Sequence, residues 1–359
     1  MQLSLCIPTH DGRAGVLRET LDGVLEQAAG DLKGRLQICI SDNASADGTE
    51  EMVARYSRAH PGLFVYSRSP TNEGFLGNLL RVTAMAEGDF CWLLSSDDQV
   101  APGGLARVMQ TLEEHPETTG VTVFTEGFDR DMAARSVHQN NPVILPDDAG
   151  RMHVDEAADE IFRNCGLFHG CFSAQIVSRG RWAAALAALG RDKLARNVHF
   201  PHLLLIGLMV KRDPRWIWLP ELTVKARRDN DALTSQLGQN LLRYQLETMR
   251  DLSQAWATLL GRRSPLYRDL MARAHADQWN GGAICALKIR SRCGPGDDWA
   301  VLVGYTRHLY FLPEYRRSSL PFALIPAFVL RLGSRMRLGP RLRALQSRRK
   351  GGAARGGAL

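Results

Sequence analysis

The feature that most constrains the fold is a regular alternation of strand-like and helix-like segments over the first hundred residues. Short apolar runs are each followed by a longer segment with apolar residues at helical spacing. We expect strands and helices in turn at 3–8, 14–28, 36–41, 49–60, 64–67, 72–86 and 90–94. This alternation predicts βαβ units, and therefore an α/β fold with a mostly parallel sheet covered by helices on both faces.

Parallel strands of this kind bind ligands beyond their carboxyl ends. That rule places four loops together at one edge of the predicted sheet. These loops are residues 9–13, 42–49, 69–74 and 95–99.

Beyond residue 100 the alternation is looser. We expect helices at 104–115, 155–164, 181–189 and 203–210, strands at 120–125, 171–178 and 216–219, and a long polar loop at 126–155. The helix at 203–210 is apolar on every side, which predicts that it is buried. From 233 to about 288 the pattern is mainly that of amphipathic helices.

The composition favours an intracellular, water-soluble protein. No window offers the roughly 18 uninterrupted apolar residues that a membrane-spanning helix needs. The first residues lack the basic region and cleavage site of a secretory signal. Seven scattered cysteines without paired spacing argue against a disulfide framework or a zinc site. We therefore expect a cytoplasmic protein.

The positive charge is concentrated at the end of the chain. Residues 315–359 hold eleven Lys and Arg and no Asp or Glu, so the rest of the chain is mildly acidic although the total is +7. The apolar stretch 320–332, directly before most of these cations, suits an in-plane contact with an anionic inner leaflet. The alternative is a core helix followed by a solvated tail. Nucleic acid is a less favoured partner, because no aromatic residues alternate with the basic ones.

Two adjacent carboxylates, Asp97 and Asp98, follow the apolar run 90–94. Carboxylates at a strand end can hold Mg²⁺ or Mn²⁺, which usually complete their shell with substrate phosphates. Taken alone, the pair is more typical of a solvated turn. The other three loops at the same edge decide between these interpretations.

Together the four loops resemble the family 2 glycosyltransferases, which have the GT-A fold. The matching segments are Pro-Thr-His-Asp-Gly-Arg at 8–13, Asp-Asn-Ala-Ser-Ala-Asp-Gly-Thr at 42–49, Asn-Glu-Gly-Phe-Leu-Gly-Asn at 72–78 and Ser-Ser-Asp-Asp at 95–98. The resemblance covers about the first 125 residues. It implies a nucleotide-sugar-binding half at 1–125 and an acceptor-binding half at 126–232. The rest of the chain is expected to form a helical region at 233–317 and a membrane-associated tail at 318–359.

The resemblance also implies roles for single residues. Asp42 would accept hydrogen bonds from the nucleobase or ribose, and Arg13 would meet a phosphate. Asp97 would be the metal ligand, with Asp98 orienting the ion or the donor sugar. The implied nucleotide-sugar contacts are Pro8, Thr9, His10, Arg13, Asp42, Asn43, Asn72, Gly74, Asn78, Ser96 and Asp97.

Several of these residues have a plain structural alternative. Arg13 could be a surface cation, Asn72 an N-cap for the next helix, and Gly74 a turn former. The chain also departs from the family pattern at Ser95, where the metal motif usually begins with an acid. This leaves one carboxylate fewer for the ion, although the donor diphosphate would supply further oxygen ligands.

The family reaction implies inversion by single displacement, with a general base for the acceptor hydroxyl. Many relatives carry this base in a Glu-Asp pair before a buried helix, but the corresponding segment 198–202 has no carboxylate. His202 is the first candidate, since histidine is a competent base near neutral pH. Alternatively, His202 has only a structural role, in the first turn of a helix that begins at Pro201. Asp192, His199 and His169 follow as candidates.

Segments 198–202 and 220–227 resemble the abequosyltransferase-like branch, which implies transfer of deoxysugars to lipid-linked intermediates of surface polysaccharides. The expected partners are thus a nucleotide-sugar donor and a lipid-linked saccharide acceptor. Two alternatives remain open: a degenerate transferase that acts as a scaffold, and a sugar-nucleotide pyrophosphorylase. The second is disfavoured because residues 9–13 are not a Gly-rich phosphate loop. A dinucleotide dehydrogenase is excluded by the lack of a GxGxxG motif.

Overall fold

The structure is a computed structural model that describes residues 2–28, 34–135, 152–227, 241–291 and 294–335. The chain separates into two compact units, Met1–Ser235 with Asp251–Leu270, and Gln236–Arg250 with Met271–Leu359. Each unit is described by itself. The finer divisions expected at residues 125, 232 and 317 stay predictions.

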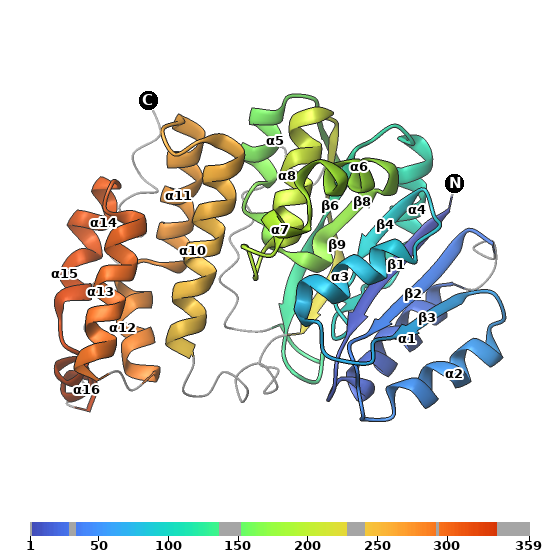
Figure 1. Ribbon diagram of the computed structural model, residues 1–359, viewed down its shortest axis with the longest axis horizontal. Helices are drawn as coiled ribbons and strands as arrows, with labels where there is room; N and C mark the ends of the chain where they lie inside the picture. The colour runs from blue at the N-terminus through green and yellow to red at the C-terminus, as the bar shows by residue number, and fades with distance from the viewer. Residues whose placement is uncertain (1, 29–33, 136–151, 228–240, 292–293, 336–359) are drawn as a thin grey trace. The chain divides into compact units, whose positions relative to one another are not determined.

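The first unit is built on a nine-stranded mixed sheet with the order β3-β2-β1-β4-β8-β6-β9-β5, and β7 pairs with β9 (Figure 1). The strands are β1 (Leu3–Thr9), β2 (Leu36–Asp42), β3 (Phe64–Arg68), β4 (Phe90–Leu93), β5 (Gln99–Val100), β6 (Gly120–Phe128), β7 (His153–Asp155), β8 (Gln175–Ser178) and β9 (Trp216–Arg227). The first four are parallel, as the alternation predicts. β8 runs antiparallel to both β4 and β6, and β6 pairs in parallel with β9.

Helices cover both faces of this sheet. Their bounds are α1 (Ala14–Gln27), α2 (Thr49–Ala59), α3 (Gly74–Ala84), α4 (Gly104–Glu114), α5 (Ala158–Cys165), α6 (Arg179–Leu189), α7 (Arg191–Leu194) and α8 (Pro201–Arg212). The order β3-β2-β1-β4 steps one way through α1 and α2 and back the other way through α3. Right-handed crossovers therefore put α3 on the face opposite to α1 and α2, where it packs on β1 and β2.

The core explains why the first strands are continuous apolar runs. No residue of β2 is exposed, and in β1 only Pro8 is even partly accessible. A strand covered on both faces needs apolar residues on both faces, so the alternating pattern of a half-exposed strand is absent. α8 is buried along nearly its whole length, as its all-round apolar sequence predicts.

Three expectations for the second half need correction. The segment 171–178 is a strand only from Gln175, because Phe172–Ala174 forms a 3₁₀ turn, η2. The strand expected at 216–219 continues to Arg227, because Pro220 falls in an irregularity of the pairing between β6 and β9 that a strand tolerates. The expected loop 126–155 contains the end of β6 and all of β7, and its residues 136–151 lie outside the described part.

The second unit is helical. It takes the first half of α10 (Leu241–Leu260) and most of α11 (Pro265–Gln278), with α12 (Gly281–Arg290), α13 (Pro295–Leu309), α14 (Pro313–Ser318), α15 (Leu320–Leu324) and α16 (Ala327–Arg335). The apolar stretch 320–332 is thus split into two short helices. Buried Lys288 holds this break, since its ammonium donates to the carbonyls of Ala323 and Ile325 and pairs with Asp298 at 3.0 Å. Among the described residues, no helix combines the length and the apolar character needed to cross a membrane.

Candidate functional site

The four predicted loops do lie together at one edge of the sheet. The strand register sets Thr9 beside Asp42 and Asp42 beside Arg68, so β1, β2 and β3 end level with one another. β4 ends at Leu93, opposite Cys6 of β1. The loop with Asp97 and Asp98 then leads into β5, which pairs with the end of β9.

Asparagine side chains connect the first three loops. Asn43 donates to the side-chain oxygen of Asn72 at 2.7 Å and accepts from the backbone amide of Glu73 at 2.8 Å. Asn78, on α3, donates to the carbonyl of Thr9 at 2.8 Å. These three predicted residues thus fix the spacing of the loops that would surround a nucleotide.

Asn72 and Gly74 also have structural roles before α3, although the N-cap expected at Asn72 is Glu73. The Asn72 side chain accepts the backbone amide of Gly74 at 2.9 Å, where α3 begins. Gly74 has a φ of +69°, a conformation that other residues adopt only with strain. Asn72 therefore closes a turn just before α3, whose N-cap residue is Glu73, and joins two loops at once.

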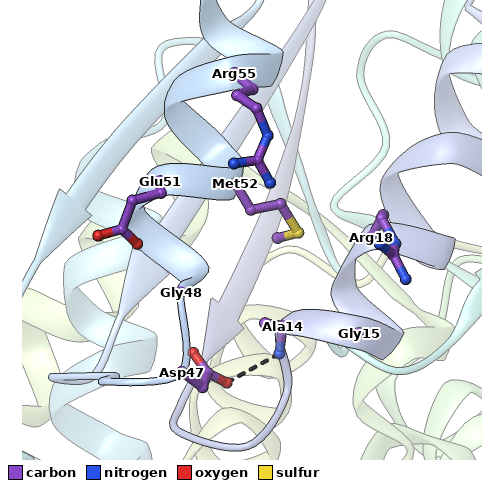
Figure 2. Close-up of a pocket in the computed structure, with 8 residues that line it drawn as sticks. All are labelled: Ala14, Gly15, Arg18, Asp47, Gly48, Glu51, Met52 and Arg55. Atoms are coloured by element: carbon purple, nitrogen blue, oxygen red, sulfur yellow. Dashed lines mark hydrogen bonds between the residues drawn. The ribbon is translucent and has the colours of Figure 1, made fainter.

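Asp47 performs a similar linking task (Figure 2). Its carboxylate accepts the backbone amide of Ala14 at 3.0 Å and the Thr49 hydroxyl at 2.6 Å, so it stabilises the starts of both α1 and α2. Burial raises the pKa of Asp47, but these hydrogen bonds lower it further than burial raises it. The carboxylate is therefore kept ionised where two helix dipoles favour negative charge.

Asp42 is fully buried at the end of β2. One carboxylate oxygen accepts the Tyr66 hydroxyl at 2.7 Å, and the other accepts the backbone amide of Ser45 at 2.9 Å. Burial, and then the bond to Asp42, raise the pKa of Tyr66. Asp42 is thus a fixed acceptor, as expected of a residue that would orient a nucleoside.

Asp97 lies beside two side chains from the rim. Arg13 forms an ion pair with it, and the Ser95 hydroxyl donates to its other oxygen at 2.5 Å. Both carboxylate oxygens therefore have partners within the protein. Ser95 departs from the family pattern as a metal ligand, yet here it positions the carboxylate that remains.

Asp98 is held more tightly than Asp97. Its carboxylate accepts the Ser173 hydroxyl at 2.5 Å and the backbone amide of Arg227 at 2.9 Å, and its carbonyl accepts the Thr20 hydroxyl at 2.9 Å. Ser173 comes from η2 and Arg227 from the end of β9. This geometry makes Asp98 a support of the loop between β4 and β5.

Arg227 is the residue that the sequence analysis missed as part of this site. Its Nε donates to the carbonyl of Asp97 at 3.0 Å, one terminal nitrogen pairs with Glu19 at 2.5 Å, and the other donates to the carbonyl of Arg130. Its side chain is only 3% exposed. The sequence signal was weak, because Arg227 lies 130 residues from the motif it supports.

Several buried polar atoms at this rim make no hydrogen bond within the described part of the chain, among them Thr9 Oγ1, Ser45 Oγ, Asn78 Oδ1 and Arg13 Nε. Buried polar atoms in native proteins nearly always have a partner. A hydroxyl, an amide oxygen and a guanidinium nitrogen match the polar groups of a nucleoside diphosphate, which offers both donors and acceptors.

Two buried histidines lie in the second half of the first unit. His202, in the first turn of α8, bonds through Nε2 to the carbonyl of Gly170 at 3.2 Å, and its ring packs on Phe75, Phe172 and Phe200. Burial lowers the pKa of His202 from 6.5 to about 4 despite that bond.

His169 is also buried, with its ring 4.9 Å from that of Trp216. Burial, and then the nearby His202, lower its pKa to about 3. Both histidines are therefore neutral at pH 7. Burial and a low pKa weaken both as bases for a hydroxyl.

Comparisons with known proteins agree with this geometry. Residues 4–179 match the family model described as Glycosyl transferase family 2. The chain is 30% identical over 238 residues to the abequosyltransferase RfbV of Salmonella typhimurium, a match that covers 65% of this chain and 68% of the relative. The chain belongs to glycosyltransferase family 2.

Solved structures show the same fold. S. aureus TarS 1–349 in complex with UDP-GlcNAc superposes with a TM-score of 0.55 at 16% identity, covering 86% of this chain and 87% of that one. The mannosyltransferase PcManGT from Pyrobaculum calidifontis, in complex with GDP-Man and Mn²⁺, gives 0.50 at 16% identity, covering 96% and 83%. The GT-A fold expected from the motifs is confirmed.

The remaining predicted residues of the glycosyltransferase lie at or near the rim. Pro8 is in β1, His10 follows it with Nδ1 2.9 Å from the carbonyl of Asp11, and buried Ser96 accepts the Thr20 hydroxyl at its carbonyl. Their contacts to a nucleotide sugar stay predictions. So does the role of Asp192, which is exposed in the first turn of α7.

The described residues fit a divalent cation in one way only. No cluster of three or more His, Cys, Asp or Glu among them could hold a metal ion. Asp98 is held by Ser173 and by the backbone of Arg227, whereas Asp97 is paired with the mobile end of Arg13, so Asp97 would be the carboxylate ligand once Arg13 turns away. Mg²⁺ and Mn²⁺ are commonly bound by one or two carboxylates plus substrate phosphates, so Asp97 fits an ion that arrives with the donor diphosphate.

A hollow of about 390 Å³ lies outside the four-loop rim, between the first turns of α1 and α2 (Figure 2). It is lined by Ala14, Gly15, Arg18, Asp47, Gly48, Glu51, Met52 and Arg55. Its two arginines and two carboxylates balance in charge. This hollow touches the four loops only through Asp47 and Gly48, at the end of the second loop, so it is not where the motifs place the nucleotide.

Proposed function

We propose that this transferase moves a sugar, with inversion, from a nucleotide-sugar donor to a hydroxyl of a lipid-linked oligosaccharide in surface polysaccharide synthesis. One observation carries the donor site: the loop of Asp97 and Asp98, braced by Arg227 and Ser173, stands beside the unpartnered rim atoms of Thr9, Asn78 and Arg13. Relatives of this fold bind UDP-GlcNAc and GDP-Man. We propose that the sugar is a deoxysugar and that the acceptor is lipid-linked because the chain is similar to the abequosyltransferase.

In this proposal the rim residues bind and orient the donor. Asp42, held by Tyr66 and Ser45, accepts hydrogen bonds from the nucleoside. Arg13 turns its guanidinium from Asp97 to the diphosphate, whose charge grows as the sugar leaves. Asp97 would hold Mn²⁺ or Mg²⁺, which when bound supplies Lewis-acid stabilisation of the leaving group.

Thermal-shift measurements with UDP-, GDP-, CDP- and dTDP-sugars, with and without Mn²⁺, test the donor site. A ligand that binds the native state raises the melting temperature, so we expect one nucleotide class to do so and Mn²⁺ to increase the shift. The Asp97→Asn variant should lose the Mn²⁺-dependent part of the melting-temperature shift. Its rate of sugar transfer should fall about 10³-fold. Asp22→Asn, on the outer side of α1, is the matched control.

Equal activity of wild type and Asp97→Asn would contradict the role of Asp97. If the wild-type protein transferred no sugar from any donor class, the scaffold alternative would replace the enzymatic one.

We also propose that the second unit rests on an anionic membrane surface, which would bring a cytoplasmic enzyme to its acceptor at the inner leaflet. α15 and α16 leave large apolar side chains exposed: Leu324, Phe328, Val329 and Leu332. Arg331 lies on α16, and the sequence continues with seven further Lys and Arg between 335 and 350. Such a mixture of apolar and basic side chains is typical of in-plane membrane contacts.

The membrane proposal is tested with vesicles that contain anionic lipid. The Phe328→Asp/Leu332→Asp double variant changes only exposed positions, so it should keep its melting temperature and lose vesicle binding. Val154→Asp, an exposed apolar position of the first unit, is the control. Unchanged binding by the double variant would contradict the proposal.

A further inference from the structure

A histidine–aspartate pair lies just before α8, in the segment where relatives carry a carboxylate base. His199 Nδ1 is 2.8 Å from the Oδ2 atom of Asp251, which comes from α10, 52 residues later in the chain. Asp251 belongs to the same compact unit as His199. Nothing in the sequence motifs connects these two residues.

The pair is firmly fixed. Asp251 is fully buried, and its Oδ2 also accepts the backbone amides of Val198 at 3.0 Å and His199 at 3.2 Å. Its carbonyl accepts the side chain of Asn197 at 2.7 Å, and Asn197 in turn accepts the backbone amide of Phe200 at 2.9 Å. The segment 197–200 is therefore held in one conformation.

These contacts decide the protonation pattern of the ring. A carboxylate oxygen that already receives two amide N–H groups acts only as an acceptor, so Nδ1 of His199 carries a proton. In the neutral ring, Nε2 then holds the lone pair. The His199 side chain is 16% exposed, in contrast to the buried ring of His202.

The same segment leads into the part of the molecule that faces the donor rim. Two residues beyond Phe200, the ring of His202 lies 6.1 Å from that of Phe75, which is in the first turn of α3, directly after the third rim loop. His202 also bonds to Gly170, and Ser173, just after it, donates to Asp98. A short chain of contacts thus connects the start of α8 with the predicted metal loop.

We propose that His199 is the general base of the transfer and that Asp251 is the residue that positions it. This inference rests on the proposed function. The acceptor O–H bond breaks and its proton goes to Nε2, while the acceptor oxygen forms a bond to the anomeric carbon. The bond from that carbon to the diphosphate breaks, its electron pair leaves with the diphosphate, and His199 later gives the proton to water.

The test uses the full-length protein and the donor class identified by thermal shift. His199→Asn keeps a side-chain N–H near the position of Nδ1, so the bond to Asp251 can persist while the base is lost. We expect kcat for transfer to fall about 10²–10⁴-fold, with the donor KM and the melting temperature nearly unchanged. Asp251→Asn should lower kcat without raising the donor KM.

Asp251→Asn should also change the tautomer of His199, which ¹⁵N NMR of the ring nitrogens reports. A merely structural role of Asp251 would leave that spectrum unchanged. His153→Asn is the matched control, since His153 pairs with Asp155 at 2.8 Å on β7 and β7 pairs with the opposite end of β9 from Arg227. That variant should keep full activity.

His199→Asn with more than a third of wild-type kcat would overturn the inference. The same holds for an Asp251→Asn variant that loses activity in step with its melting temperature while its His199 spectrum stays wild-type. An inactive wild-type protein would instead refute the proposed function, so the two failures are distinguishable.

Discussion

The two halves of the site are built in different ways. In the first half, Thr9, Asp42 and Asp97 come directly at or after strand ends, and their partners are mostly in neighbouring loops. In the second half, His199 depends on Asp251, 52 residues away. The first half has its chemistry in contiguous motifs, while the second half acquires it only when distant segments pack together.

The largest effect is expected at Arg227. This residue belongs to the second half but supports a motif of the first half, so its loss tests whether the two halves are independent. In Arg227→Met the carbonyl of Asp97 and the carboxylate of Glu19 each lose a charged donor. We expect transfer to fall at least 100-fold and the free energy of unfolding to fall by about 2–3 kcal/mol. A transfer assay measures the first effect and chemical denaturation the second.

Arg215→Met is the control for Arg227, because Arg215 makes only surface ion pairs with Glu117 and Glu156. Such pairs contribute about 0–1 kcal/mol. Equal loss of stability in the two variants would show that Arg227 has no special role.

A change of pH probes a buried group of the second half. Below pH 6.5 the unfolded chain protonates His202, whereas the folded protein does not until about pH 4. The free energy of unfolding should therefore fall as the pH drops from 6.5 to 4, by up to about 1.4 kcal/mol per pH unit for this one group. The free energy of unfolding, measured at pH 7, 6, 5 and 4, should fall less steeply with pH for His202→Phe than for wild type.

The exposed His60 provides the control for the pH experiment. His60→Gln should show the same pH dependence as wild type. A wild-type stability that stayed flat between pH 6.5 and 4 would contradict the burial of both His169 and His202 as neutral rings.

The smallest effect is expected at Ser95. Ser95→Ala removes the hydroxyl that donates to Asp97 at 2.5 Å but leaves the carboxylate and its pairing with Arg13. Loss of one such bond costs about 1 kcal/mol, so the Mn²⁺ concentration for half-maximal transfer should rise a few-fold. Titration of activity with Mn²⁺ measures it, and an unchanged midpoint would mean that Ser95 does not position Asp97.

The sequence predicted the first half of the site better than the second. Apolar runs and loop motifs predicted the first four strands, their helices and the rim, because each depends on a few adjacent residues. The start of α3 was placed two residues early, since Asn72 uses its side chain rather than its backbone at the helix end.

The second half could not be read in this way. β9 continues through Pro220, which usually ends a strand, because the pairing with β6 is irregular there. Asp251 sits in an amphipathic helix among other polar residues, with no local pattern to mark it. Whether His202 or His199 is better placed as a base depends on which ring is buried, and that is decided by Phe75, Phe172 and Phe200.

The contacts of Arg227 have a consequence for protein engineering. A chimera that takes residues 1–125 from a relative with another donor preference would import Glu19 and Asp97 but keep the β9 that braces them. In such a chimera the grafted loop would lose the contacts that hold it, unless the relative's own loop is also held by an arginine at the end of β9. Donor preference in this enzyme should therefore be exchangeable only together with the last residues of β9.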